Sequence, residues 1–97
     1  MLKILLRSTM LMVALTILAS SVAQAANIEY CQQYAQEAVN HVRAGREKPG
    51  CATDMQGPRW SVSLRVHFNY CMSNPVNTVE NARSARDEYL RSCGAIR

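Results

Sequence analysis

The fold is decided first by the stretch NIEYCQQYAQEAVNHVRA, residues 27–44. Its apolar side chains recur at three- and four-residue steps, which is typical of one face of an amphipathic helix. Asn27 can cap the start of this helix, and Glu29 suits the positive end of its dipole. Gly45 is the residue at which we expect the helix to stop. The apolar face consists of Ile28, Cys31, Ala35, Ala38, Val39 and Val42.

The third and last predicted helix lies near the C-terminus, where Asn74-Pro75 supplies a cap and a first turn. Asp87 and Arg91 form an acid-first pair at four-residue spacing, which supports a helix. Gly94 is the expected stop. One side of this helix carries Val76, Val79, Ala82, Arg86, Tyr89, Leu90 and Cys93, with Arg86 as an amphipathic exception.

Residues 60–72 carry two patterns at once. Alternating apolar residues favour a strand, whereas Trp60, Leu64 and Cys71 also fit one helical face. A lone strand would have no partner in the chain, so we expect a helix. The preceding loop, residues 45–58, contains Lys48-Pro49-Gly50-Cys51, which favours a type II turn, and a break at Gly57-Pro58. The predicted fold class is therefore an all-α, three-helix domain.

The N-terminal residues 1–25 have the features of a cleaved secretory signal peptide. Lys3 and Arg7 provide the charged start, residues 11–19 the apolar run, and Ala23-Gln24-Ala25 a small-x-small site. The apolar run is shorter than the roughly 20 residues of a membrane-spanning helix. We therefore expect cleavage before Ala26 and no lasting membrane anchor. The mature chain, residues 26–97, would form a single domain.

The charge balance gives little reason to expect a nucleic-acid partner. The whole chain has 11 basic and 7 acidic residues, a formal charge of +4. Without Lys3 and Arg7 the balance is 9 − 7 = +2. An excess this small is typical of an ordinary solvated surface.

Four cysteines, at positions 31, 51, 71 and 93, follow the predicted signal. In an exported chain they indicate two disulfides and a periplasmic or secreted location. Sequence alone allows three pairings, and loop-closure entropy does not choose among them. Three helices running up, down and up would bring Cys31 to Cys71 at one end and Cys51 to Cys93 at the other. This pairing is the one we predict.

Three stretches resemble a pattern of an uncharacterised family of short exported proteobacterial proteins. They are YCxxYAxxAV from Tyr30, GPRWS from Gly57, and HxxYC from His67 together with RxxYLxxC from Arg86. The family pattern has Trp before the third cysteine and Gly after the second, where this chain has Tyr70 and Ala52. The resemblance covers nearly the whole mature chain. It implies one compact module with a helical second segment and supplies no catalytic residues.

Catalytic and metal sites are weakly indicated. A metal site would need both histidines, His41 and His67, with Met72 or a carboxylate. The alternative is two packed or surface histidines, and we predict no metal and no cofactor. Disulfide formation would consume every thiol nucleophile, and the adjacent acids Asp87 and Glu88 point to different helix faces. We therefore do not expect an enzyme.

Candidate binding residues are Arg59, Trp60 and His67. Arg59 and Trp60 could stack on a sugar ring or hold an anionic group, or Trp60 could fill the core at the start of the second helix. Arg83, Arg86 and Arg91 form either a basic patch or a solvated helix face.

The sequence thus favours a small exported non-catalytic protein, a protein-interaction or envelope-associated module whose partner is an envelope protein. The first alternative is a module that binds cell-wall glycan or another anionic polymer. The second is a metal-binding periplasmic protein.

Overall fold

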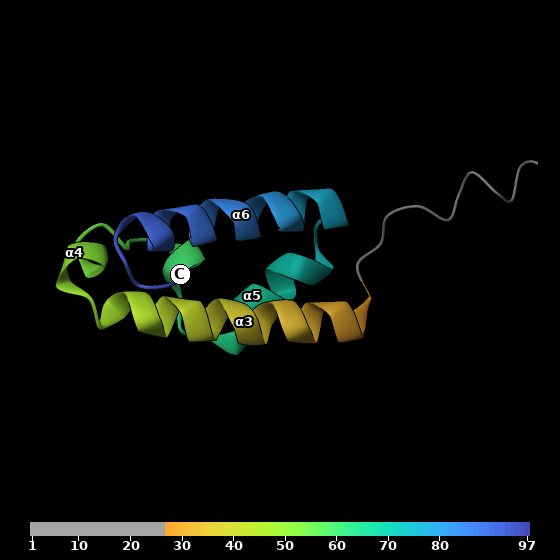
Figure 1. The fold of residues 1–97 in the computed structure, drawn as a ribbon. Helices are drawn as coiled ribbons and strands as arrows, with labels where there is room; N and C mark the ends of the chain where they lie inside the picture. Colours follow the sequence, from red (N-terminus) through yellow and green to blue (C-terminus); the bar gives the residue numbers. More distant parts are fainter. Residues whose placement is uncertain (1–26) are drawn as a thin grey trace, which may run out of the picture.

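The chain folds into an all-helical domain with three main helices (Figure 1). A computed structural model describes residues 27–97, so the predicted signal peptide lies outside the described residues. In chain order the elements are α3 (Ile28–Arg46), α4 (Pro49–Ala52), the 3₁₀ turn η1 (Pro58–Trp60), α5 (Leu64–Met72) and α6 (Val76–Ser92). The predicted fold class is confirmed. Within the described residues, no helix has the length and apolar character needed to cross a membrane.

Helix α3 begins as predicted but does not end at Gly45. The side-chain oxygen of Asn27 accepts a hydrogen bond of 2.7 Å from the backbone N–H of Tyr30, which caps the helix. Gly45 lies inside the helix and is buried. A Cβ there would lie 2.6 Å from Leu90 Cδ2. Gly45 therefore permits close approach of the α6 side chain, and the prediction of a stop at this residue was wrong.

The connection after α3 contains a short helix in place of the predicted type II turn. Pro49 occupies the first turn of α4, where its missing N–H has no helical partner to lose. Further along, Gly57 has φ +94, a left-handed conformation that glycine adopts without a steric cost. Gly57 directly precedes η1.

The second segment is helical, but over a shorter range than predicted. The hydroxyl of Ser63 accepts a hydrogen bond of 3.4 Å from Val66 N, so α5 starts at Leu64. Trp60 belongs to η1 and is separated from α5 by extended backbone. At the other end, the Asn74 amide donates to the Tyr70 carbonyl at 2.8 Å, and Pro75 precedes α6. Asn74 therefore closes α5 and does not cap α6, whose cap position is held by Pro75.

Two disulfides join the helices at opposite ends of the domain. Cys31 pairs with Cys71, and Cys51 pairs with Cys93, the pairs expected from helix placement. Each belongs to its own buried cluster: Cys31 and Cys71 pack with Tyr34 and Val79, whereas Cys51 packs with Val42, Met55, Trp60 and Leu90. Disulfides of this kind are typical of an oxidising environment outside the cytoplasm.

Candidate functional site

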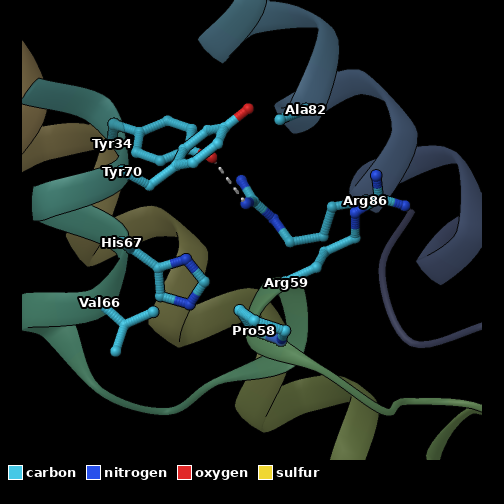
Figure 2. A pocket seen from close by; sticks show the side chains of 8 residues that line it. All are labelled: Tyr34, Pro58, Arg59, Val66, His67, Tyr70, Ala82 and Arg86. Atoms are coloured by element: carbon cyan, nitrogen blue, oxygen red, sulfur yellow. Dashed lines mark hydrogen bonds between the residues drawn. The ribbon is translucent and has the colours of Figure 1, made fainter. Parts of the chain in front are cut away.

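A pocket of about 220 Å³ lies where α3, η1, α5 and α6 meet (Figure 2). Helix α5 places Val66 and Tyr70 four residues apart on one face, next to His67. The Tyr70 ring stacks beside that of Tyr34 from α3, with centroids 6.4 Å apart. The lining residues are Tyr34, Pro58, Arg59, Val66, His67, Tyr70, Ala82 and Arg86. The pocket is thus mainly apolar and aromatic, with cationic groups on one side.

Arg86 is the main polar group of the pocket. Its side chain is 1% exposed, and Nη1 donates to the Tyr34 hydroxyl at 3.4 Å. Within the described residues, its Nε and Nη2 atoms have no hydrogen-bond partner. A buried arginine with donors left open is costly, because lost hydration is not replaced by hydrogen bonds. The prediction that Arg86 belongs to a solvated helix face or basic patch was therefore wrong.

Two carboxylates lie near Arg86 but outside hydrogen-bond distance. Glu37 Oε1 is 3.9 Å from Arg86 Nη2, and Asp87 Oδ1 is 3.9 Å from Arg86 Nε. They offset the positive charge of Arg86 in part. The Arg86 guanidinium also lies 5.3 Å from the centroid of the Tyr34 ring, a favourable cation–π arrangement. Arg86 is held in place by charge, by stacking and by the hydrogen bond to Tyr34, while its Nε and Nη2 atoms have no hydrogen-bond partner within the described residues.

His67 forms another wall of the pocket and is 3% exposed. Its Nε2 lies 2.7 Å from the Ser61 carbonyl oxygen, so this nitrogen carries the proton that it donates. Burial lowers the pKa of His67 below the ordinary value. The hydrogen bond to Ser61 acts in the opposite direction, and the positive charge of Arg86 lowers the pKa further. His67 is therefore a neutral group near pH 7.

The structure brings together two of the three predicted binding residues. Arg59 is exposed and lines the pocket together with His67. Trp60 instead is 6% exposed and packs against Tyr89, with ring centroids 5.0 Å apart. The hypothesis that Trp60 stacks on a sugar was wrong, because its ring is in the core. Trp60 fills the core, as the structural alternative expected, but it belongs to η1 and not to the start of the second helix.

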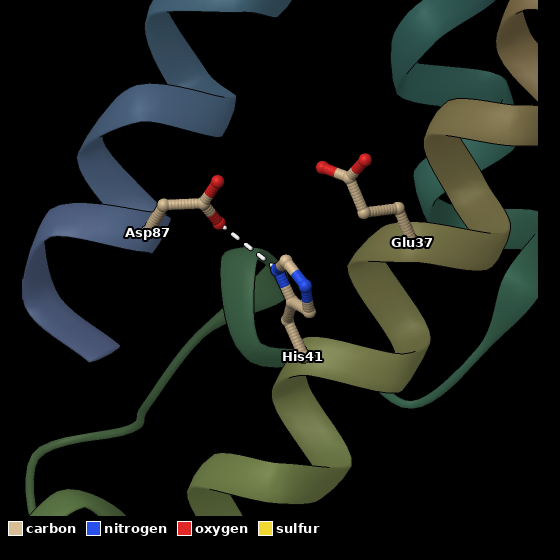
Figure 3. Close-up of side chains that lie close together, drawn as sticks. All are labelled: Glu37, His41 and Asp87. Atoms are coloured by element: carbon tan, nitrogen blue, oxygen red, sulfur yellow. Dashed lines mark hydrogen bonds and ion pairs between the residues drawn. The ribbon is translucent and has the colours of Figure 1, made fainter. Parts of the chain in front are cut away.

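A second polar cluster lies between α3 and α6 (Figure 3). It consists of Glu37, His41 and Asp87, whose nearest ligand atoms all lie within 4.8 Å of one another. His41 Nδ1 is 3.0 Å from Asp87 Oδ1. Asp87 is 9% exposed, so this carboxylate is largely buried. It faces His41 because it lies on the side of α6 that packs toward α3.

These three residues could supply metal ligands, but their carboxylates already face arginines. Arg83 Nε lies 2.9 Å from Glu37 Oε1, and Arg83 also pairs with Glu80. His67 belongs to the pocket, so His41 and His67, both of which a metal site would need, do not lie together in the described residues. The cluster is best described as an ion-pair network that joins α3 to α6.

The sequence did not predict that Tyr34 lines the pocket and contacts Arg86. It also did not predict that two Arg86 donor atoms would lack a hydrogen-bond partner within the described residues. The available signal was the position of Arg86 on the apolar side of its helix. The chain matches no protein-family model, no curated protein and no solved structure. The site geometry therefore carries the functional argument.

Proposed function

We propose that this protein is an exported, non-catalytic binding domain that takes an anionic group of its partner into the pocket. The observation that carries the proposal is Arg86, a buried arginine that lines a cavity and whose Nε and Nη2 atoms have no hydrogen-bond partner among residues 27–97. A carboxylate or phosphate oxygen would satisfy those donors and be bound by charge-assisted hydrogen bonds.

The surroundings of Arg86 favour an anion with an apolar neighbour. Arg59 adds a second positive charge at the exposed edge of the pocket, and Tyr34 and Tyr70 provide aromatic walls. Within residues 27–97, no acidic side chain lines this pocket. Glu37 and Asp87 lie 3.9 Å from Arg86 and moderate its charge, so the expected affinity for a simple anion is weak.

A binding role is also supported by the state of the cysteines. All four lie in the described region and all are paired, so none is free to act as a nucleophile or metal ligand. The proposal therefore assigns no cysteine-based catalysis to this protein.

Export is supported by the N-terminal pattern and by the disulfides. Residues 1–25 fit a signal peptide, and both disulfides require an oxidising compartment to persist. We place the protein in the periplasm or outside the cell. The resemblance to short exported proteobacterial proteins agrees with this location. Cell fractionation with N-terminal sequencing tests it, and a mature chain beginning at Ala26 is the expected result.

Anion binding is tested by NMR titration of the purified protein with sodium acetate, benzoate and phosphate at constant ionic strength. We expect saturable shifts of the Arg86 Nε–H and His67 signals, largest for benzoate because its ring can contact the tyrosines. Arg86→Gln should abolish these shifts. Arg91→Gln is the matched control, because Arg91 is exposed and its Nε donates to the Arg97 carbonyl at 3.2 Å. Shifts that sodium chloride reproduces, or that persist in Arg86→Gln, would overturn the proposal.

A further inference from the structure

The large exposed apolar side chains are concentrated on and just before α5. Within the described residues, six large hydrophobic residues are exposed, and all except Ile28 lie between positions 62 and 72. They are Val62, Leu64, Val66, Tyr70 and Met72. Val66 and Tyr70 lie on the flank of α5 that borders the pocket, and we name these two the α5 apolar surface, whereas Leu64 and Met72 lie on the opposite flank of the helix. Scattered exposed apolar residues need no explanation, but a group on one short segment does.

The α5 apolar surface is continuous with the pocket. Val66, 39% exposed, and Tyr70, 37% exposed, belong to both (Figure 2). On the other flank of α5, Leu64 lines a second, more open hollow together with Phe68 and Ala35. A ligand whose anionic group reaches Arg86 would therefore contact apolar side chains at the pocket mouth.

The chain segment that carries the α5 apolar surface has only positive charges. Residues 55–79 include no aspartate or glutamate, whereas Arg59 and Arg65 are both exposed. Arg86, which is buried, lines the adjoining pocket. This surface is complementary to a partner that combines negative charge with apolar groups.

We infer that the partner is a protein segment that presents a carboxylate flanked by apolar side chains, an inference that rests on the proposed function. The carboxylate enters the pocket toward Arg86, and the flanking side chains lie on the α5 apolar surface. An acidic glycan would supply the charge but not the apolar groups. Trp60, the candidate ring for stacking on a sugar, is 6% exposed and does not line this pocket within the described residues.

Selection of random peptides by phage display on the immobilised purified protein tests this inference. We expect enriched peptides to share an aspartate or glutamate with aliphatic or aromatic residues beside it. An enriched peptide is then synthesised in three forms: unchanged, with its acid replaced by the amide, and with its apolar neighbours replaced by serine. Each replacement should weaken binding about tenfold, as expected for a lost charge-assisted hydrogen bond or buried apolar side chain.

Variants of the protein locate the contact. Val66→Ser should weaken binding of the unchanged peptide by several-fold and should not change binding of the serine-substituted peptide. Ile28→Ser is the matched control, because Ile28 is 59% exposed but lies outside the α5 apolar surface, and it should bind all peptides normally.

Three outcomes would overturn the inference. They are no enriched peptide, enriched peptides without acidic residues, and equal competition by polygalacturonate, an acidic glycan without apolar side chains. The acetate and benzoate titration separates this inference from the proposed function. If acetate and benzoate still shift the Arg86 Nε–H signal, the pocket binds anions and only the inference of a protein segment fails. If they do not, both fail.

Discussion

Gly45 of α3 lies directly against Leu90 of α6, so close that a Cβ at position 45 would be 2.6 Å from Leu90 Cδ2. Met55 Cε and Sδ would also lie within 2.9 Å of that Cβ. Both side chains are buried, so neither can move away freely. The two long helices approach each other at this point because residue 45 has no side chain.

Gly45→Ala should therefore destabilise the domain even though alanine favours a helix. The helical gain is about 1 kcal/mol, and overpacking a core costs about 1–3 kcal/mol. We expect a net loss of about 1 kcal/mol in the free energy of unfolding, measured by urea denaturation. Gly50→Ala in α4 is the control, since a Cβ there meets nothing within 4 Å. If the Gly45→Ala protein were as stable as the Gly50→Ala protein, the packing of Leu90 and Met55 against residue 45 would have room for a Cβ atom.

Each disulfide should contribute strongly to stability. The bridges span 40 and 42 residues, and closing loops of this length constrains the unfolded chain by about 4 kcal/mol each in the chain-entropy model. Replacing both cysteines of one bridge with alanine should lower the urea midpoint sharply, and replacing all four should unfold the domain. Cooperative unfolding of the four-alanine variant at the wild-type midpoint would contradict this prediction.

Acid should destabilise the domain through His67. Because the pKa of His67 is lowered in the folded protein, protonation favours the unfolded chain. The contribution is complete above about pH 6.5, the unfolded value, and is lost as the pH falls toward the lowered folded pKa. His67→Gln should remove this acid-dependent loss, as measured by urea unfolding above and below that pH. His41→Gln is the control, because His41 faces the Asp87 carboxylate and not the pocket. If the free energy of unfolding of His67→Gln depended on pH in the same way as that of the wild type, His67 would not be the cause of the acid-dependent loss.

Added Zn²⁺ or Cu²⁺ should not raise the melting temperature of the protein. A metal at Glu37, His41 and Asp87 would have to compete with Arg83, 2.9 Å from Glu37, and with Arg86, 3.9 Å from both carboxylates. Differential scanning calorimetry with metal and with chelator checks this. A saturable increase that His41→Ala abolishes would establish a metal site in place of the ion-pair network.

Local signals in the sequence were sufficient to predict the main helices but not the contacts between them. The Asn27 cap and the stop at Gly94, which has φ +84, depend on nearby backbone and were predictable. Gly45 has the same local signature as a stop, and only its position against Leu90 reveals its packing role. Trp60 and Arg86 show the same limit: the structure buries both side chains, and two Arg86 donor atoms have no hydrogen-bond partner within the described residues.

Replacing Arg86 with an apolar residue separates a structural role from a binding role. Glu37 already pairs with Arg83 and Asp87 with His41, so neither carboxylate depends on Arg86 for a hydrogen-bonded partner. Replacing a buried charge with an apolar side chain of similar size is often neutral or stabilising by about 1–4 kcal/mol. We therefore expect Arg86→Met to fold with unchanged or higher stability in urea and to lose anion binding. If Arg86→Met instead loses about 3 kcal/mol or more, the value expected for a broken buried ion pair, then Arg86 serves the fold. In that case its open donors would no longer indicate a ligand.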